Sequence, residues 1–105
     1  MELKCYSEII DLINQWGIDR QITRENGCGG KRQAVKMAEE LDEFTDALEY
    51  NNRAEIIDAI GDMFVVLVQM ARLEDVNLLE AINSAYNEIK DRKGKMINGI
   101  FVKDA

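Results

Sequence analysis

The segment from Arg53 to Leu73 constrains the fold more than any other part of the chain. Beyond Asp62 it is almost entirely apolar, with an unbroken apolar run over Met63–Val68. The chain contains no proline, and three of its seven glycines lie in one segment, residues 27–30, so long uninterrupted helices are favoured. A helix that is apolar around its whole circumference belongs at the centre of a fold. We therefore expect a central, buried helix over residues 53–73.

Three further helices are predicted around it. An amphipathic pattern from Leu3 to Trp16 indicates a first helix that ends near Gly17, and residues 31–49 form a second amphipathic pattern. Asn77 is suited to cap a fourth helix that runs through Lys93, and the tail from Gly94 onward has room for a turn or a brief strand. The predicted apolar stripe of the second helix consists of Ala34, Met37, Ala38, Leu41, Phe44 and Leu48.

The chain is short for a fold with such a central helix. Its 105 residues match one ordinary domain, and three short neighbouring helices cannot easily surround residues 53–73. Part of that apolar surface is expected to pack against a second copy. We predict an all-α fold with four main helices in one domain, residues 1–105, forming an antiparallel bundle that a second subunit completes.

Composition excludes several classes of function. The formal net charge is −7, which argues against a nucleic-acid polymer as partner, and no histidine is present, which excludes Cys/His zinc sites and histidine-activated nucleophiles. A bound metal must then be a hard cation held by oxygen ligands. The first residues lack the basic start and apolar run of a signal peptide, and Met63–Val68 is too short to span a bilayer. We expect a cytoplasmic protein without a membrane partner.

The second predicted helix carries closely spaced carboxylates. Glu40 and Glu43 are three residues apart, so they project from one face and can hold one hard cation between them. Glu39 precedes them directly, and Lys36 lies on the same edge of the helix, beside the apolar stripe. The alternative interpretation is an ordinary solvated acidic face, which such a string on its own favours.

The central helix also carries carboxylates, at Glu55, Asp58 and Asp62. The helix dipole favours an acidic residue in the first turn and so explains Glu55, but it does not explain Asp62, which lies more than two turns in. An uncompensated carboxylate beside an apolar run costs several kcal/mol, and residues 54–71 contain no Lys or Arg. Together the two helices supply four carboxylates that suit Mg²⁺ or Mn²⁺, whereas a di-iron bundle requires histidines that this chain lacks.

A cationic cluster lies near the end of the chain, at Lys90, Arg92, Lys93 and Lys95. These side chains could contact phosphate oxygens, and the alternative is the usual enrichment of cations in a last helical turn. Asn87 is a candidate polar contact to a base or sugar. Trp16 either stacks on a base or belongs to the core.

The segment Lys36-Met-Ala-Glu39-Glu40-Leu-Asp-Glu43, followed by Ile60-Gly61-Asp62-Met-Phe-Val-Val-Leu67, resembles the MazG-like all-α nucleoside triphosphate pyrophosphohydrolases. The resemblance extends from about residue 33 to residue 92. It implies a magnesium-dependent enzyme that converts a nucleoside triphosphate to monophosphate and pyrophosphate and assembles as a dimer or tetramer. The implied roles are catalytic for Glu39, metal-binding for Glu40, Glu43, Asp58 and Asp62, and phosphate-binding for Lys90 or Arg92. We assign Trp16, Lys36 and Asn87 to substrate binding as well.

The chain departs from the family pattern before Asp62. The family has glutamate three residues before this aspartate, where this chain has Ala59, and Asp58 lies one position earlier. An i, i+4 pair points to nearly the same side of a helix as an i, i+3 pair, so we assign the fourth ligand to Asp58. The alternative register, Glu55-Ile-Ile-Asp58, satisfies the ExxD pattern literally but loses the alignment to Asp62.

Two rival functions remain beside a nucleoside triphosphate pyrophosphohydrolase. One is a non-catalytic helical interaction module that uses the apolar helix for dimerisation. The other is a related pyrophosphohydrolase that acts on phosphoribosyl-ATP. Pyrophosphate release from a panel of nucleotides would distinguish an enzyme from the interaction module. Competition between substrates would distinguish a nucleoside triphosphate pyrophosphohydrolase from an enzyme that acts on phosphoribosyl-ATP.

Overall fold

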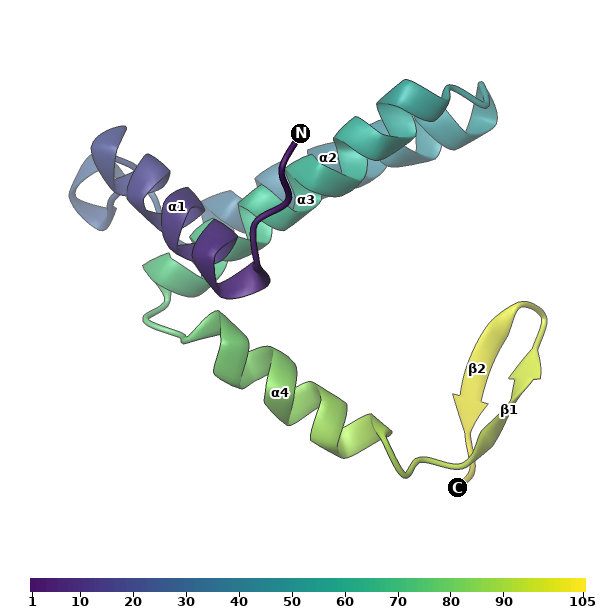
Figure 1. Ribbon diagram of the computed structural model, residues 1–105. Coiled ribbons are helices and arrows are strands. Elements are labelled where there is room, and N and C mark those ends of the chain that lie inside the picture. Colours follow the sequence, from purple (N-terminus) through teal and green to yellow (C-terminus); the bar gives the residue numbers. More distant parts are fainter.

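The computed structural model describes residues 1–105 and consists mainly of helices (Figure 1). In chain order the helices are α1 (Tyr6–Asp19), a short 3₁₀ turn η1 (Arg24–Asn26), α2 (Gly30–Glu49), α3 (Arg53–Leu73) and α4 (Leu78–Ile89). A β-hairpin follows, with strands β1 (Gly94–Ile97) and β2 (Ile100–Lys103). The predicted four helices are thus present, and the predicted brief strand in the tail is a two-stranded hairpin. None of the helices combines the length and the apolar composition needed to cross a bilayer.

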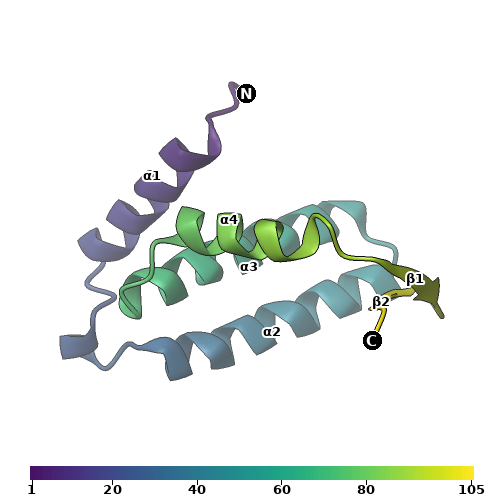
Figure 2. The same ribbon diagram turned by 90° about the horizontal axis from the view of Figure 1, so that it is seen from below.

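Helices α2 and α3 form an antiparallel hairpin that carries the candidate site (Figures 1 and 2). The turn between them spans residues 50–52, and Asn51 adopts a left-handed conformation there, with φ of 50°. Asn52 caps α3, because its side-chain oxygen accepts a hydrogen bond from the Glu55 backbone N–H at 3.2 Å. Since the sequence supplies both the turn and the cap, α3 begins and ends at the predicted residues.

Helix α1 packs against the C-terminal half of α3. Gln69 of α3 is fully buried, and its side-chain amide donates to the Ile13 carbonyl oxygen at 3.1 Å. Arg72 donates to Gln69 Oε1 and to the carbonyl oxygen of Ile22, at 2.6 Å and 2.7 Å. These hydrogen bonds hold α1 and the following loop on α3, beside a small core of Ile10, Val68 and Leu78.

The predicted end of the first helix near Gly17 is wrong, because α1 continues to Asp19. Gly17 lies inside the helix and is buried. A Cβ atom at this position would overlap with Gln69 Oε1 and would lie 2.9 Å from Arg72 Nη2. The glycine is therefore required for the close approach of α1 to α3 and does not terminate the helix. The predicted end of the fourth helix is also wrong, since α4 ends at Ile89.

The face that α2 turns toward α3 differs from the predicted stripe. Met37 and Phe44 are half-buried as predicted, but Leu41 and Leu48 are exposed, and Ala34 and Ala38 are exposed as well. Glu40 and Ala47 take the most buried positions. The apolar pattern of α2 was misleading here because a carboxylate occupies the inward face.

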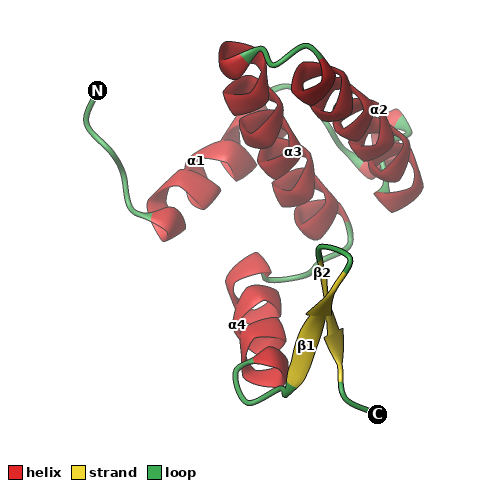
Figure 3. Cartoon of the chain, turned by 90° about the vertical axis from the view of Figure 1, so that its right-hand side faces the viewer, coloured by secondary structure: helices red, strands yellow, loops and turns green.

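Helix α4 and the hairpin, residues 78–103, extend away from the rest of the chain as an arm (Figures 1 and 3). Only Leu78 of α4 is buried. The hairpin closes through Asn98 and Gly99, both with positive φ, and pairs Met96 with Phe101 and Ile97 with Ile100. All four of these paired side chains are exposed, although an isolated two-stranded hairpin is marginally stable in water.

We propose that a second copy covers this arm. The accessible surface of the chain is 8397 Å², against about 6,000 Å² for a folded monomer of its 12.0 kDa mass, an excess of about 2,400 Å². The radius of gyration is 16.2 Å, where about 13 Å is usual. If each of two chains buried this excess, the interface would total about 4,800 Å², which is within the range of obligate homodimers. We expect light scattering at micromolar concentration to give at least twice the mass of 12.0 kDa; a mass of one chain would contradict the proposal.

Gly17→Ala should destabilise the protein by about 1 to 3 kcal/mol, because the hydrogen-bonded Gln69 amide cannot move aside for the new Cβ. Gly61→Ala is the matched control, since nothing in the chain lies within 4 Å of a Cβ at that helical position. This change should stabilise α3 by about 0.5 to 1 kcal/mol. Urea unfolding monitored by circular dichroism measures both, and the same sign for the two variants would refute the packing argument.

Candidate metal and nucleotide site

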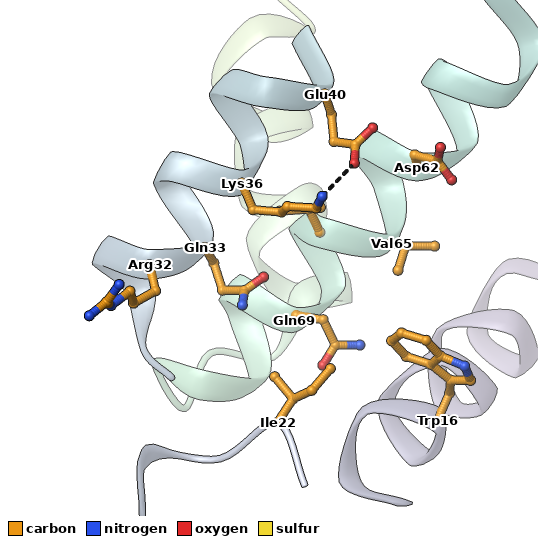
Figure 4. A pocket seen from close by; sticks show the side chains of 10 residues that line it. Trp16, Ile22, Arg32, Gln33, Lys36, Glu40, Asp62, Val65 and Gln69 are labelled. Carbon is orange, nitrogen blue, oxygen red and sulfur yellow. Dashed lines mark ion pairs between the residues drawn. The ribbon is translucent and has the colours of Figure 1, made fainter. Parts of the chain in front are cut away.

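The site is built where α2 and α3 face each other. Glu40 and Glu43 of α2 and Asp62 of α3 each place one carboxylate oxygen within 4.8 Å of the others. The i, i+3 spacing puts the two glutamates on one side of α2, and the antiparallel hairpin brings the middle of α3 opposite them. Figure 4 shows Glu40 on α2 and Asp62 on the facing α3, at the same end of the pocket. Three of the four predicted metal-binding carboxylates are thus brought together.

Glu40 is unusual among these residues because it is buried, with only 6% of its surface exposed. Its Oε1 atom forms an ion pair with Lys36 Nζ at 3.3 Å, and Lys36 precedes Glu40 by one turn of α2. Its Oε2 atom is buried and has no hydrogen-bond partner. A buried carboxylate oxygen without a partner costs free energy, so this atom fits a ligand that the chain itself does not supply.

The electrostatics of the three carboxylates also favour a bound cation. Burial, followed by the charges of Asp58 and Glu40, raises the pKa of Asp62 above its ordinary value. The adjacent Glu40 raises the pKa of Glu43, first because a protonated Glu43 can donate a hydrogen bond to the Glu40 carboxylate and second through the Glu40 charge. The three carboxylates therefore repel one another, and a divalent cation would relieve this repulsion. The donor set of carboxylate oxygens fits Mg²⁺ or Mn²⁺.

A pocket of about 470 Å³ opens beside the carboxylates (Figure 4). One end carries Glu40 and Asp62, with Lys36 next to them. The apolar part of the lining consists of Trp16, Ile22, Val65 and Val66, and the polar remainder consists of Arg32, Gln33 and Gln69. A pocket with carboxylates, cations and an aromatic ring suits a ligand that has a phosphate chain at one end and a flat ring at the other.

Asp58 lies outside the three-carboxylate group. It lines a second hollow of about 280 Å³, together with Glu43, Asp46, Glu55 and Ala59. Ala59, three residues before Asp62, is buried, whereas Asp58 and Glu55 are both exposed. The one-residue shift that the sequence analysis treated as equivalent thus turns the carboxylate toward solvent, and only its charge acts on Asp62.

The other predicted residues divide into two groups. Trp16 and Lys36 line the pocket, and Glu39 borders it through an ion pair with Lys36 at 3.5 Å. Asn87, Lys90 and Arg92 do not line it, because they lie on the arm and are exposed. Within one chain these three residues are therefore separate from the carboxylates.

Sequence reasoning missed Arg32, Gln33 and Gln69. Gln33 and Lys36 are three residues apart, and Glu40 follows four residues later, so the three share one face of α2. That spacing could have predicted Gln33 as part of the pocket lining. No sequence pattern predicts Gln69 there, because nothing in the sequence distinguishes a buried glutamine amide after an apolar run from a solvated one.

One of the comparisons with known proteins names a family. A family model described as phosphoribosyl-ATP pyrophosphohydrolase matches residues 17–92, and that family is related to the MazG-like superfamily. An uncharacterised 18.2 kDa protein from the rep-hol intergenic region of Haemophilus phage HP1 (strain HP1c1) is 33% identical over 76 residues, or 71% of this chain. The aligned region is 45% of that relative, so the chain spans less than half of its length. No solved structure matches the chain significantly.

Asp62→Asn should raise the melting temperature in the presence of a chelator at neutral pH. Because the pKa of Asp62 is raised, the folded chain binds more protons than the unfolded chain in the window between the ordinary and the raised value. Stability therefore falls as the pH rises through this window, and the loss persists above it. The variant lacks this loss, so its advantage should shrink as the pH falls toward about 4.

The same variant should lose most of the stabilisation that Mg²⁺ gives the parent protein. Asp42→Asn is the control, because Asp42 is exposed on α2 and outside the three-carboxylate group. Thermal melts with and without Mg²⁺ measure both effects. An undiminished Mg²⁺ response in Asp62→Asn would show that this carboxylate does not hold the ion.

Proposed function

This chain belongs to the phosphoribosyl-ATP pyrophosphohydrolase family, and from that membership we propose that it is a metal-dependent enzyme that hydrolyses a nucleotide to a monophosphate and pyrophosphate. The observation that carries the proposal is the buried Glu40 carboxylate, which has one oxygen without a partner and lies beside Glu43 and Asp62. An interaction module would have no reason to bury an unsatisfied carboxylate at the wall of a pocket.

Glu40, Glu43 and Asp62 would hold the cation, and Asp58 would act on it from the neighbouring hollow through its charge. Members of the family are typically metal-dependent. When bound, Mg²⁺ or Mn²⁺ supplies an activated water and neutralises charge on the phosphate chain. Glu39 borders the site as an exposed carboxylate, where it could accept a proton from an attacking water.

Substrate binding follows from the two ends of the pocket. Lys36, which pairs with Glu40, would contact the phosphate chain next to the carboxylates, and Arg32 would contact it from farther along the pocket lining (Figure 4). Trp16 would stack on the base at the apolar end, and Arg20 lies over its ring at 4.6 Å from the centroid. Asn87, Lys90 and Arg92 would reach a substrate only in the site of a second copy, as the divergent arm allows.

The substrate is proposed as a nucleoside triphosphate, with deoxynucleotides as favoured candidates. The family description favours phosphoribosyl-ATP as a second candidate, since both substrates present a phosphate chain with a scissile bond that yields pyrophosphate. The pocket volume of about 470 Å³ is in the range of nucleotide-sized ligand sites.

We expect the purified protein to release pyrophosphate from at least one common nucleoside triphosphate or from phosphoribosyl-ATP when Mg²⁺ or Mn²⁺ is present. Asp62→Asn should abolish turnover, because it removes one of three carboxylates that converge on the cation. Asp42→Asn should leave turnover nearly unchanged. Coupled pyrophosphate detection over a nucleotide panel, with competition between the active substrates, measures these outcomes.

Two further variants separate the possible fourth carboxylates. Asp58→Asn should lower turnover less than Asp62→Asn does, because Asp58 acts from outside the three-carboxylate group. If Asp58→Asn is harmless and Glu55→Gln abolishes activity, the literal ExxD register is correct. Release of orthophosphate only, or no turnover over the whole panel, would refute the proposed enzyme and favour the interaction module.

A further inference from the structure

We propose that Lys36 is the counter-ion of the carboxylate cluster in the metal-free protein and transfers its contact to the phosphate chain when a divalent cation binds. This inference rests on the proposed function and adds a positioning role for one residue of the same site. Lys36 would thus weaken the binding of the metal ion, with which its ammonium competes, and strengthen the binding of the phosphate chain.

The contacts of Lys36 join it to the carboxylates of its own helix. Its Nζ atom lies 3.3 Å from Glu40 Oε1 and 3.5 Å from Glu39 Oε2, so the ammonium bridges two successive glutamates of its own helix. The dashed line in Figure 4 marks the contact with Glu40. Glu40 is buried, whereas the Lys36 side chain is 52% exposed, so the ammonium caps a buried carboxylate from the open side of the pocket.

No other cation in the structure pairs with the cluster. The other ion pairs join Lys4 to Glu8 and Arg24 to Glu74, on different parts of the chain. One ammonium faces three converging carboxylates, so it leaves excess negative charge at the cluster and leaves Glu40 Oε2 without a partner. A divalent cation matches this charge better than Lys36 does.

The position of Lys36 allows it to turn to the phosphate chain. A cation among the three carboxylates weakens the attraction between Glu40 and the ammonium. The lysine stem is flexible and its head carries three donors, so the ammonium can reorient without any change in the helix. Lys36 lines the same pocket as Arg32, in which the proposed function places the phosphates.

Lys36→Met separates the two roles because methionine keeps much of the side-chain length but has no charge. In calorimetric titrations with Mn²⁺ alone, the variant of the full chain should bind Mn²⁺ about three- to tenfold more tightly than the parent, since the competing ammonium is gone. In titrations with inorganic tripolyphosphate at saturating Mn²⁺, it should bind the anion about tenfold more weakly.

Two controls accompany this variant. Lys31→Met removes a charge from the same helix at a position outside the pocket lining, so both affinities should stay within about twofold of the parent if only the general field changes. Lys36→Arg keeps the charge and should retain Mn²⁺ affinity close to that of the parent. Circular dichroism verifies that each variant is folded, and Lys36→Gln, which also removes the charge, takes the place of Lys36→Met with the same expected changes if Lys36→Met does not fold.

The outcomes distinguish this inference from the proposed function. Weaker or unchanged Mn²⁺ binding in Lys36→Met, unchanged tripolyphosphate binding, or tighter Mn²⁺ binding in Lys36→Arg would overturn the role of Lys36, even if the parent hydrolyses nucleotides. If the parent binds no Mn²⁺ and releases no pyrophosphate, both the inference and the proposed function fail.

Discussion

Burial of the Glu40 carboxylate between α2 and α3 is the interaction on which the site and its surroundings depend. The carboxylate sits on the inward face of α2, at a position that an apolar residue would normally take. Its charge is balanced in part by Lys36 on one side, and it is opposed by Glu43 and Asp62 on the other. A buried charge held in this way is a free-energy cost to the folded chain, and such a cost is tolerated where it creates a binding site. The α2/α3 hairpin is therefore both the structural centre of the chain and the wall of the pocket.

Helix α3 connects this site to the rest of the structure. Its N-terminal half carries Asp58 and Asp62, and its C-terminal half carries Gln69 and Arg72, which hold α1 and the loop before α2 through hydrogen bonds. That contact places Trp16 and Ile22 over the apolar end of the pocket. The close packing at Gly17 thus has a functional consequence, because the position of α1 fixes the distance between the aromatic ring and the carboxylates.

The sequence predicted the parts of the structure that depend on local signals. The bounds predicted for α3, residues 53–73, agree with the structure, and helical spacing predicted three of the four carboxylates that the structure brings together. It failed where tertiary contacts override such signals. Gly17 looked like a helix end but is a packing position against Gln69. Leu41 and Leu48 looked like core residues but are exposed, because Glu40 takes the inward face of α2. The shift from position 59 to Asp58 looked harmless, yet a rotation of one residue on a packed helix separates a buried position from an exposed one.

Apolar residues are exposed both on α2 and on the arm. The inward face of α2 is occupied by Glu40 together with Ala47, Met37 and Phe44, so Leu41 and Leu48 remain outside. Because α4 contacts α3 mainly through Leu78, the apolar residues farther along α4 remain outside too. The exposed leucines of α2 and the exposed apolar residues of α4 form more apolar surface than a monomer usually leaves in contact with water. The arm also carries Lys90 and Arg92, which lack any acidic partner within 4.0 Å in their own chain. An arm that packs on a second copy would cover apolar surface and bring cations toward an acidic pocket in one step. If the proposed second copy packs in this way, the carboxylate in the core of the hairpin and the open shape of the chain would both belong to a site that two subunits share.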